Sequence, residues 1–424
     1  MKNKKRTPIN NKNIIIKNNN KLWARFIKVS ILFILISANL LLLNIFFIKN
    51  KLFINSNSNN LKLNNKTNII EYISKIRGIN YLNKCLNKSK ENSNLNLNNS
   101  KLKRFNNRPK ISVIIPVYNC QKSIEISLTS ILNQNMKDYE VILVNDNSSD
   151  NSLKIINKIK KDDNRIKVIN NHKNMGTLYS RSIGALNAIG KYIFSLDNDD
   201  MFLDEDIFVT IYNLAYKNNY DIVEFKSFII PNYKPEIKDI KQNYFNSHPT
   251  NLILHQPELG IYPISRNGKF YANDFLIWAK CIKTELYQKS VTALGKKRYS
   301  IYNCWTEDIS MIFIIFNLAK SYIFVNKYGI FHLISKKTTS RILHQEHKIF
   351  AQIYLLDIIL DFSKETKYYK KFAVLKAYEI SNKLKNYNLS EFNNKFLKSI
   401  LNKMLHCKYI NQNDKILIKK KFSK

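Results

Sequence analysis

Short apolar segments alternate with amphipathic segments between residues 111 and 202, and this alternation limits the folds open to the chain more than any other feature. The apolar segments are ISVIIPV, YEVILV, IKVIN and KYIFSL. Between the first two, Ile124, Leu128 and Ile131 recur at helical spacing. Strands that alternate with helices over this length predict an α/β fold, with an open, mostly parallel sheet and helices on both faces.

Polar residues follow these predicted strands at the point where each one ends. Tyr118 follows the first strand, Asp146 the second, and Asp197 to Asp200 the fourth. Taken alone, each stretch is typical of a turn, because Asp, Asn and Ser stabilise tight loops through their own backbone. The carboxyl ends of parallel strands meet at one edge, where such sheets bind ligands. The three stretches together therefore predict one binding crevice.

The crowded carboxylates of LDNDD indicate a metal site. Asp197, Asp199 and Asp200 would repel one another unless a divalent cation lay among them. We expect the ion to be Mg²⁺ or Mn²⁺, bound by one or two of these carboxylates, with Asp200 as a weaker candidate. Such an ion would stabilise the charge on a departing diphosphate. At the other end of the crevice, the Tyr118 ring is suited to stack on a base whose N–H the Asp146 carboxylate accepts.

Four motifs in this region, IPVYN, VNDNSSD, NMGTLYSRSIG and LDNDD, resemble the nucleotide-sugar-binding half of family 2 glycosyltransferases, which have the GT-A fold. The resemblance implies that Tyr118 and Asp146 bind the nucleotide base and that Arg181 contacts the nucleotide. It also implies that Asp197 and Asp199 hold the ribose and the metal. The departures from the family pattern are Asn145, Asn147, Ser180 and Ser182.

The acceptor half is expected to contain a general base. Glu307 and Asp308 precede an apolar helix that begins near Ile309, and acids in a first turn are also favoured by the helix dipole alone. An inverting transfer needs a base to take the proton of the acceptor hydroxyl. The resemblance assigns this role to Asp308 and places Glu307 beside the nucleotide sugar.

Three further residues are weaker candidates. Residues 273–290 resemble a helix-rich stretch in which a W-x-K turn, here Trp278 and Lys280, lies near the donor. A core tryptophan beside a solvated lysine is the alternative interpretation. His332 lies where some family members keep a residue that closes over the phosphates or the metal, and a packed histidine is the alternative there.

The N-terminal region predicts a membrane anchor. Residues 29–48 form an uncharged apolar run, long enough at 1.5 Å per residue to cross a bilayer of about 30 Å. Nine Lys and Arg and no acid precede it, so we expect a cytosolic N-terminus and a lumenal catalytic domain in the endoplasmic reticulum or Golgi apparatus. A cleaved signal peptide is the competing interpretation. The predicted parts are a basic tail (1–28), the anchor (29–48), a stem with a short helix near 69–82 (49–108), the nucleotide-sugar half (109–225), the acceptor half (226–344) and a helical region (345–424).

The net charge of +38 does not indicate a nucleic-acid partner. Residues 1–110 contain 23 Lys and Arg against two acids, so much of the excess lies outside the part with folded character. No zinc-ligand spacing or nucleic-acid-binding motif accompanies the charge.

We therefore expect a metal-dependent, inverting glycosyltransferase that moves a sugar from a nucleotide diphosphate, with UDP as the expected nucleotide. Its acceptor would be a hydroxyl of a glycan, glycolipid or protein. Two alternatives remain: a synthase that uses a dolichol-type lipid phosphate as acceptor, and a noncatalytic lumenal binding protein that keeps the fold.

Overall fold

A computed structural model describes residues 66–92, 108–242, 253–255, 276–302, 306–334 and 345–363, together with a few positions near the C-terminus. One compact unit comprises Ile70–Lys424. No helix within the described ranges is long and apolar enough to cross a membrane. The expected anchor at 29–48 lies outside those ranges, so the anchor and the lumenal location stay predictions.

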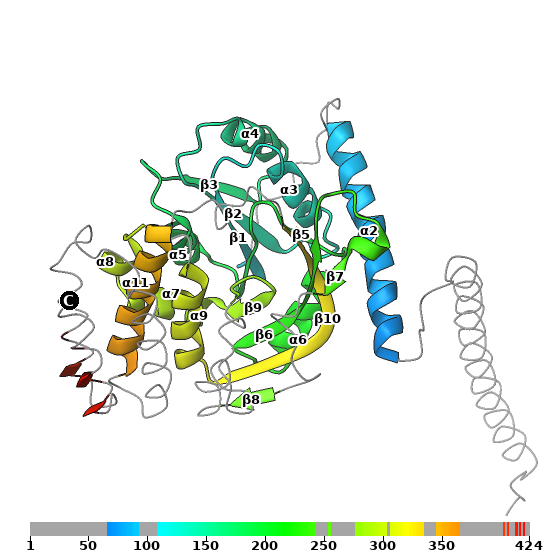
Figure 1. Cartoon of the computed structure of the whole chain (residues 1–424). Coiled ribbons are helices and arrows are strands. Elements are labelled where there is room, and N and C mark those ends of the chain that lie inside the picture. The colour runs from blue at the N-terminus through cyan, green and yellow to red at the C-terminus, as the bar shows by residue number, and fades with distance from the viewer. Residues whose placement is uncertain are drawn as a thin grey trace, which may run out of the picture. The chain divides into compact units, whose positions relative to one another are not determined.

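One twisted sheet forms the centre of this unit (Figure 1). The strands are β1 (Ile111–Val117), β2 (Tyr139–Asn145), β3 (Ile166–Asn170), β4 (Tyr192–Ser195), β5 (Met201–Phe202), β6 (Ile222–Ile230), β7 (Lys241–Gln242), β8 (Ile253–His255), β9 (Lys280–Lys283) and β10 (Ser321–Leu333). Their order is β3-β2-β1-β4-β9-β6-β10-β5, with β7 paired to β6 and β8 to β10. All four apolar segments singled out in the sequence are strands.

The sheet contains the predicted parallel strands together with antiparallel ones that were not predicted. Strands β3, β2, β1 and β4 are parallel to one another, and β6 is parallel to β10. β9 lies antiparallel between β4 and β6, and β5, β7 and β8 are also antiparallel to their partners. The expected helical character of residues 273–290 is wrong at its centre, because Lys280–Lys283 is this inserted strand.

Helices cover both faces of the sheet, as predicted (Figure 1). They are α2 (Lys66–Asn92), α3 (Ile124–Leu132), α4 (Ser152–Asp162), α5 (Thr177–Asn187), α6 (Ile207–Lys217), α7 (Thr284–Leu294), α8 (Lys296–Tyr299), α9 (Glu307–Leu318) and α11 (Gln345–Ser363). Because side chains alternate along a strand, Ile114 packs with α5, α7, α9 and α11, whereas Val113 and Ile115 pack with α3, α4 and α6.

Helix α2 is longer than the short helix expected in the predicted stem. It spans 27 residues, and Tyr81, Leu82 and Cys85 on it are buried in a third apolar cluster with Phe331 of β10. The apolar face of α2 therefore packs on the sheet, and part of the predicted linker belongs to the folded unit.

Gly190 should not tolerate a side chain, because a Cβ there would lie 2.5 Å from the backbone of Ile111 and Ser112. We expect Gly190→Ala to lower the free energy of unfolding by about 1–3 kcal/mol, since strand β1 would have to shift. Urea titration followed by circular dichroism measures the change. Leu186→Ala, at an exposed position just before the same loop, is the control and should change stability little. Equal stability of Gly190→Ala and the wild type would contradict this account.

Candidate functional site

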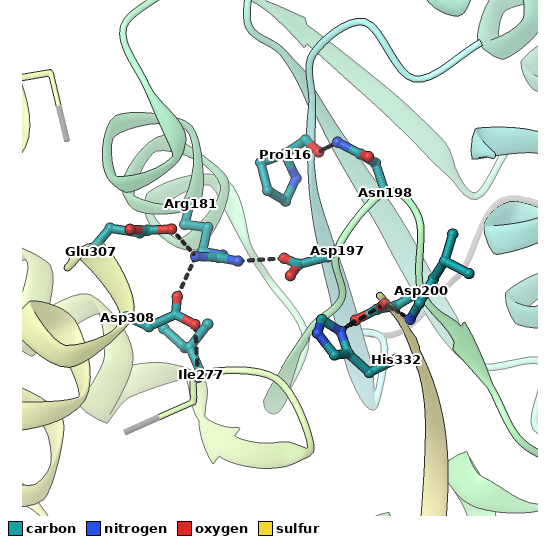
Figure 2. Close-up of polar contacts among 10 residues, drawn as sticks. Pro116, Arg181, Asp197, Asn198, Asp200, Ile277, Glu307, Asp308 and His332 are labelled. Atoms are coloured by element: carbon teal, nitrogen blue, oxygen red, sulfur yellow. Dashed lines mark hydrogen bonds and ion pairs between the residues drawn. The ribbon is translucent and has the colours of Figure 1, made fainter. Parts of the chain in front are cut away.

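Arg181 joins carboxylates that come from two distant parts of the chain (Figure 2). It lies on α5, and its side chain is only 4% exposed. Its Nη2 contacts Asp197, which follows β4, and its Nη1 contacts Asp308 in the first turn of α9. The Glu307 carboxylate lies 3.7 Å from the same Nη1. Asp197, from the predicted donor side, and Asp308, the predicted base, therefore both contact the Arg181 guanidinium.

Burial and mutual repulsion change the acidity of these groups. Burial and the neighbouring Asp308 carboxyl together raise the pKa of Glu307 to about 8, although Arg181 opposes the shift. Burial also raises the pKa of Asp308, although Arg181 opposes the shift. Burial alone would lower the pKa of Arg181, but the surrounding acids outweigh it, so the guanidinium stays charged.

A second cluster lies on the other side of Asp197 and contains Asp200 and His332 (Figure 2). Nδ1 of His332 is 3.0 Å from both oxygens of the fully buried Asp200 carboxylate. Burial lowers the pKa of His332, but the pairing with Asp200 outweighs it and raises the value to about 9.

This second cluster fits a divalent cation. One ligand atom each of Asp197, Asp200 and His332 lies within 4.8 Å of the others. Two carboxylates with one imidazole suit Mn²⁺, which accepts nitrogen as well as oxygen ligands, better than Mg²⁺. A bound cation would displace the proton from the imidazole, because a ligating histidine is neutral.

The cluster differs from the predicted metal pair of Asp197 and Asp199. Asp199 is not among the residues that could jointly hold the ion, whereas the weaker candidates Asp200 and His332 are. The backbone carbonyl of Asp199 accepts a 2.5 Å hydrogen bond from the Tyr233 hydroxyl. Burial, with Asp200 and Asp197 nearby, raises the pKa of the Asp199 side chain to about 8.

The turn at 276–279 connects the two clusters. The Ile277 N–H points to Oδ2 of Asp308 at 3.4 Å, and the Trp278 ring stacks on His332 with centroids 4.7 Å apart. Lys280 does not face the site, because Nζ donates to the Leu276 carbonyl at 2.6 Å. Trp278 is therefore both a packed residue and a neighbour of the site.

The Lys280 ammonium also makes a buried ion pair. Its Nζ lies 3.1 Å from Glu224 on β6, and both side chains are 1% exposed. The Tyr322 hydroxyl donates to the same carboxylate at 3.2 Å. This pair holds the base of the turn and corrects the interpretation of Lys280 as a solvated lysine.

The predicted base-binding end contains the exposed ring of Tyr118 and the carboxylate of Asp146, which already accepts three hydrogen bonds. Tyr118, just after β1, is 44% exposed and presents a free surface for stacking. Asp146 is buried, and its oxygens accept hydrogen bonds from the Met175 and Gly176 backbone N–H groups and from the Asn171 side chain, at 2.7–2.8 Å. In this structure Asp146 holds the loop before α5, and its contact with a base stays a prediction.

Three groups at or beside the site were not predicted from the sequence: Glu224, Asn171 and the Ile277 backbone. The one signal available was the acid of Glu224 inside the apolar segment DIVEFKSFII, because a charge in a buried strand requires a partner. Backbone N–H groups carry no signal in the sequence.

Comparison with known proteins gives a family match and partial relatives. Residues 112–267 match the model of glycosyl transferase family 2. A cholesterol galactosyltransferase of Borreliella burgdorferi is 28% identical over 279 residues, which are 64% of this chain and 74% of that protein. An uncharacterized glycosyltransferase of Haemophilus influenzae is 40% identical over 101 residues, which are 24% of this chain and 40% of that protein.

A solved structure of Staphylococcus aureus TarS, residues 1–349 in complex with UDP-GlcNAc, has a partial likeness to this chain. The TM-score is 0.48 and the sequence identity 17%, over 73% of this chain and 83% of that one.

The buried ion pair can be tested without an activity assay. Lys280→Met leaves Glu224 without its cation, so we expect the free energy of unfolding to fall by about 3–5 kcal/mol. Lys283→Met is the matched control on the same strand. Its pair with Asp221 is more exposed, at 20% and 12%, so we expect a smaller loss of stability. Adding Glu224→Gln to Lys280→Met should recover stability, and no recovery would contradict the pairing.

Proposed function

We propose that this chain, which belongs to glycosyl transferase family 2 by its domain at residues 112–267, transfers a sugar from a nucleotide-diphosphate donor to an acceptor hydroxyl with inversion. The observation that carries the proposal is the bridge made by the buried Arg181, which holds Asp197 after β4 and Asp308 on α9 within one partly buried cluster. One displacement needs groups for the leaving diphosphate and for the incoming hydroxyl in the same site.

Asp308 is suited to act as the general base. Its carboxylate is positioned from two sides, by Arg181 and by the Ile277 N–H, and burial raises its pKa. In the proposed step Asp308 takes the proton of the acceptor hydroxyl as its oxygen forms the bond to the anomeric carbon. The bond from that carbon to the nucleotide diphosphate breaks at the same time.

Charge supports a divalent cation beside the leaving group. Five carboxyl groups surround the Arg181 guanidinium and the His332 imidazole, and they belong to Asp197, Asp199, Asp200, Glu307 and Asp308. Asp197, Asp200 and His332 would hold the ion. When bound, it would neutralise charge on the departing diphosphate. Without it, protons would have to offset the repulsion, as the raised pKa values of Asp199 and Glu307 indicate.

The nucleotide is proposed to lie toward β1 and β2. The exposed Tyr118 ring would stack on the base, and the expected nucleotide is UDP. Arg181 already binds carboxylates through both terminal nitrogens, so we assign it first to hold the acids rather than to contact the nucleotide.

Asp308→Asn tests the base and separates the two acceptor chemistries. With a hydroxyl acceptor we expect kcat to fall by about 10²- to 10⁴-fold while nucleotide binding is kept, because asparagine cannot accept the proton. The wild-type kcat/KM should rise with pH through the raised pKa of Asp308, and the variant should lose this rise. Glu307→Gln, in the same helical turn, is the matched control and should lose less. If Asp308→Asn transfers the sugar to a lipid-phosphate acceptor at the wild-type rate, the lipid-phosphate sugar synthase is favoured, because a phosphate acceptor needs no base.

The cation can be tested by removal and replacement. Chelation with EDTA should abolish transfer, and Mn²⁺ should restore it better than Mg²⁺, because His332 supplies a nitrogen ligand. His332→Gln should reduce that preference for Mn²⁺. Release of nucleotide diphosphate measures the rate, and full activity in EDTA would contradict the metal assignment.

A further inference from the structure

The Asp200–His332 pair depends on a strand of two residues. β5 consists of Met201 and Phe202, and Met201 lies opposite Phe331 of β10 in an antiparallel register. Continuing this register by one residue places Asp200 opposite His332. The Leu333 N–H donates to Oδ1 of Asp200 at 3.0 Å, which completes the arrangement. A small shift between β5 and β10 would therefore separate the two side chains.

A two-residue strand has too few ladder hydrogen bonds to fix its own register, so packing must hold it. Met201 and Phe331, one of the two residue pairs in register, are both fully buried in the apolar cluster that includes α2. Tyr81, Leu82 and Cys85 of α2 belong to the same apolar cluster. Figure 1 shows α2 running alongside β5, β7 and β10.

Gly78 permits this close contact. A Cβ at Gly78 would lie 2.4 Å from the Phe331 ring and 3.0 Å from Leu203, so only glycine lets the backbone of α2 approach β10 here. Glycine inside a helix costs about 1 kcal/mol relative to alanine, and the chain bears that cost at this contact.

Two polar contacts fix α2 to the segment after Asp200. The Tyr81 hydroxyl donates to the Ser130 carbonyl at 2.8 Å, and the Ser130 hydroxyl accepts from the Phe202 N–H at 3.2 Å. Lys84 forms an ion pair with Glu205. The helix thus contacts the β5 side of the short pair through Ser130 and Glu205, and the β10 side through Phe331.

We propose that α2, which lies outside residues 112–267, is a positioning element for the Asp200–His332 pair and sets its affinity for a divalent cation. Gly78 and Tyr81 are its positioning residues. The cation part of this inference rests on the proposed function, whereas the placement of His332 does not.

Full-length Gly78→Leu is the test, with Asn80→Leu at an exposed position of the same helix as the matched control. Leucine favours the helix, so any harm from Gly78→Leu comes from its clash with Phe331. We expect the Kd for Mn²⁺, from titration of free Mn²⁺ by electron paramagnetic resonance, to rise about 10-fold in Gly78→Leu and to stay unchanged in Asn80→Leu. Transfer at saturating Mn²⁺ should recover toward the wild-type rate. Should Gly78→Leu fail to fold, Tyr81→Phe removes one hydroxyl and should weaken Mn²⁺ about 3-fold.

A readout without metal separates this inference from the proposed function. The Nδ1–H proton of His332, hydrogen-bonded to Asp200, should give a downfield proton resonance that His332→Gln removes. We expect Gly78→Leu, or Tyr81→Phe in its place, to shift this resonance and Asn80→Leu to keep it. An unchanged resonance and an unchanged Kd in a folded α2 variant would overturn the inference. If the wild-type protein binds no Mn²⁺ and the α2 variant still shifts the His332 resonance, the cation role alone is overturned.

Discussion

The Arg181 guanidinium is the interaction on which the site depends. It lies buried between Asp197 and Asp308, with Glu307 nearby, so removing it would leave several acids close together with little water to screen them. A buried charge cluster of this kind is weak evidence for stability, because desolvation offsets much of the attraction. It does fix geometry, because the planar fork sets the positions of two carboxylates at once.

The first half of the fold could be predicted from the sequence because its signals are local. Apolar segments of strand length, such as ISVIIPV, alternate with helical spacing, and the structure has strands and helices at those places. The strand β9 was not predictable in this way. Its four residues follow Trp278 in a segment with helical character, and only pairing with β4 and β6 makes it a strand.

The site was predictable to the extent that the motifs carry it. Asp197, Asp308 and Arg181 come together, but the partner of Asp200 turned out to be His332, which lies 132 positions away in sequence. No local pattern gives the register of β5 on β10, because tertiary packing under α2 sets it. The role of Lys280 could not be predicted either, because a lysine in a sequence can be exposed at the surface or buried in an ion pair.

The hydrogen bonds of Asp146 have a mechanical consequence. They hold Gly176, the residue before α5, and Arg181 lies little more than one turn into that helix. A ligand that competes for the Asp146 oxygens would release the start of α5 and let the helix tilt or slide. The guanidinium would move with it and loosen its hold on Asp308. Occupancy at the proposed base-binding end would then be transmitted through one rigid helix to the proposed proton acceptor at the other end.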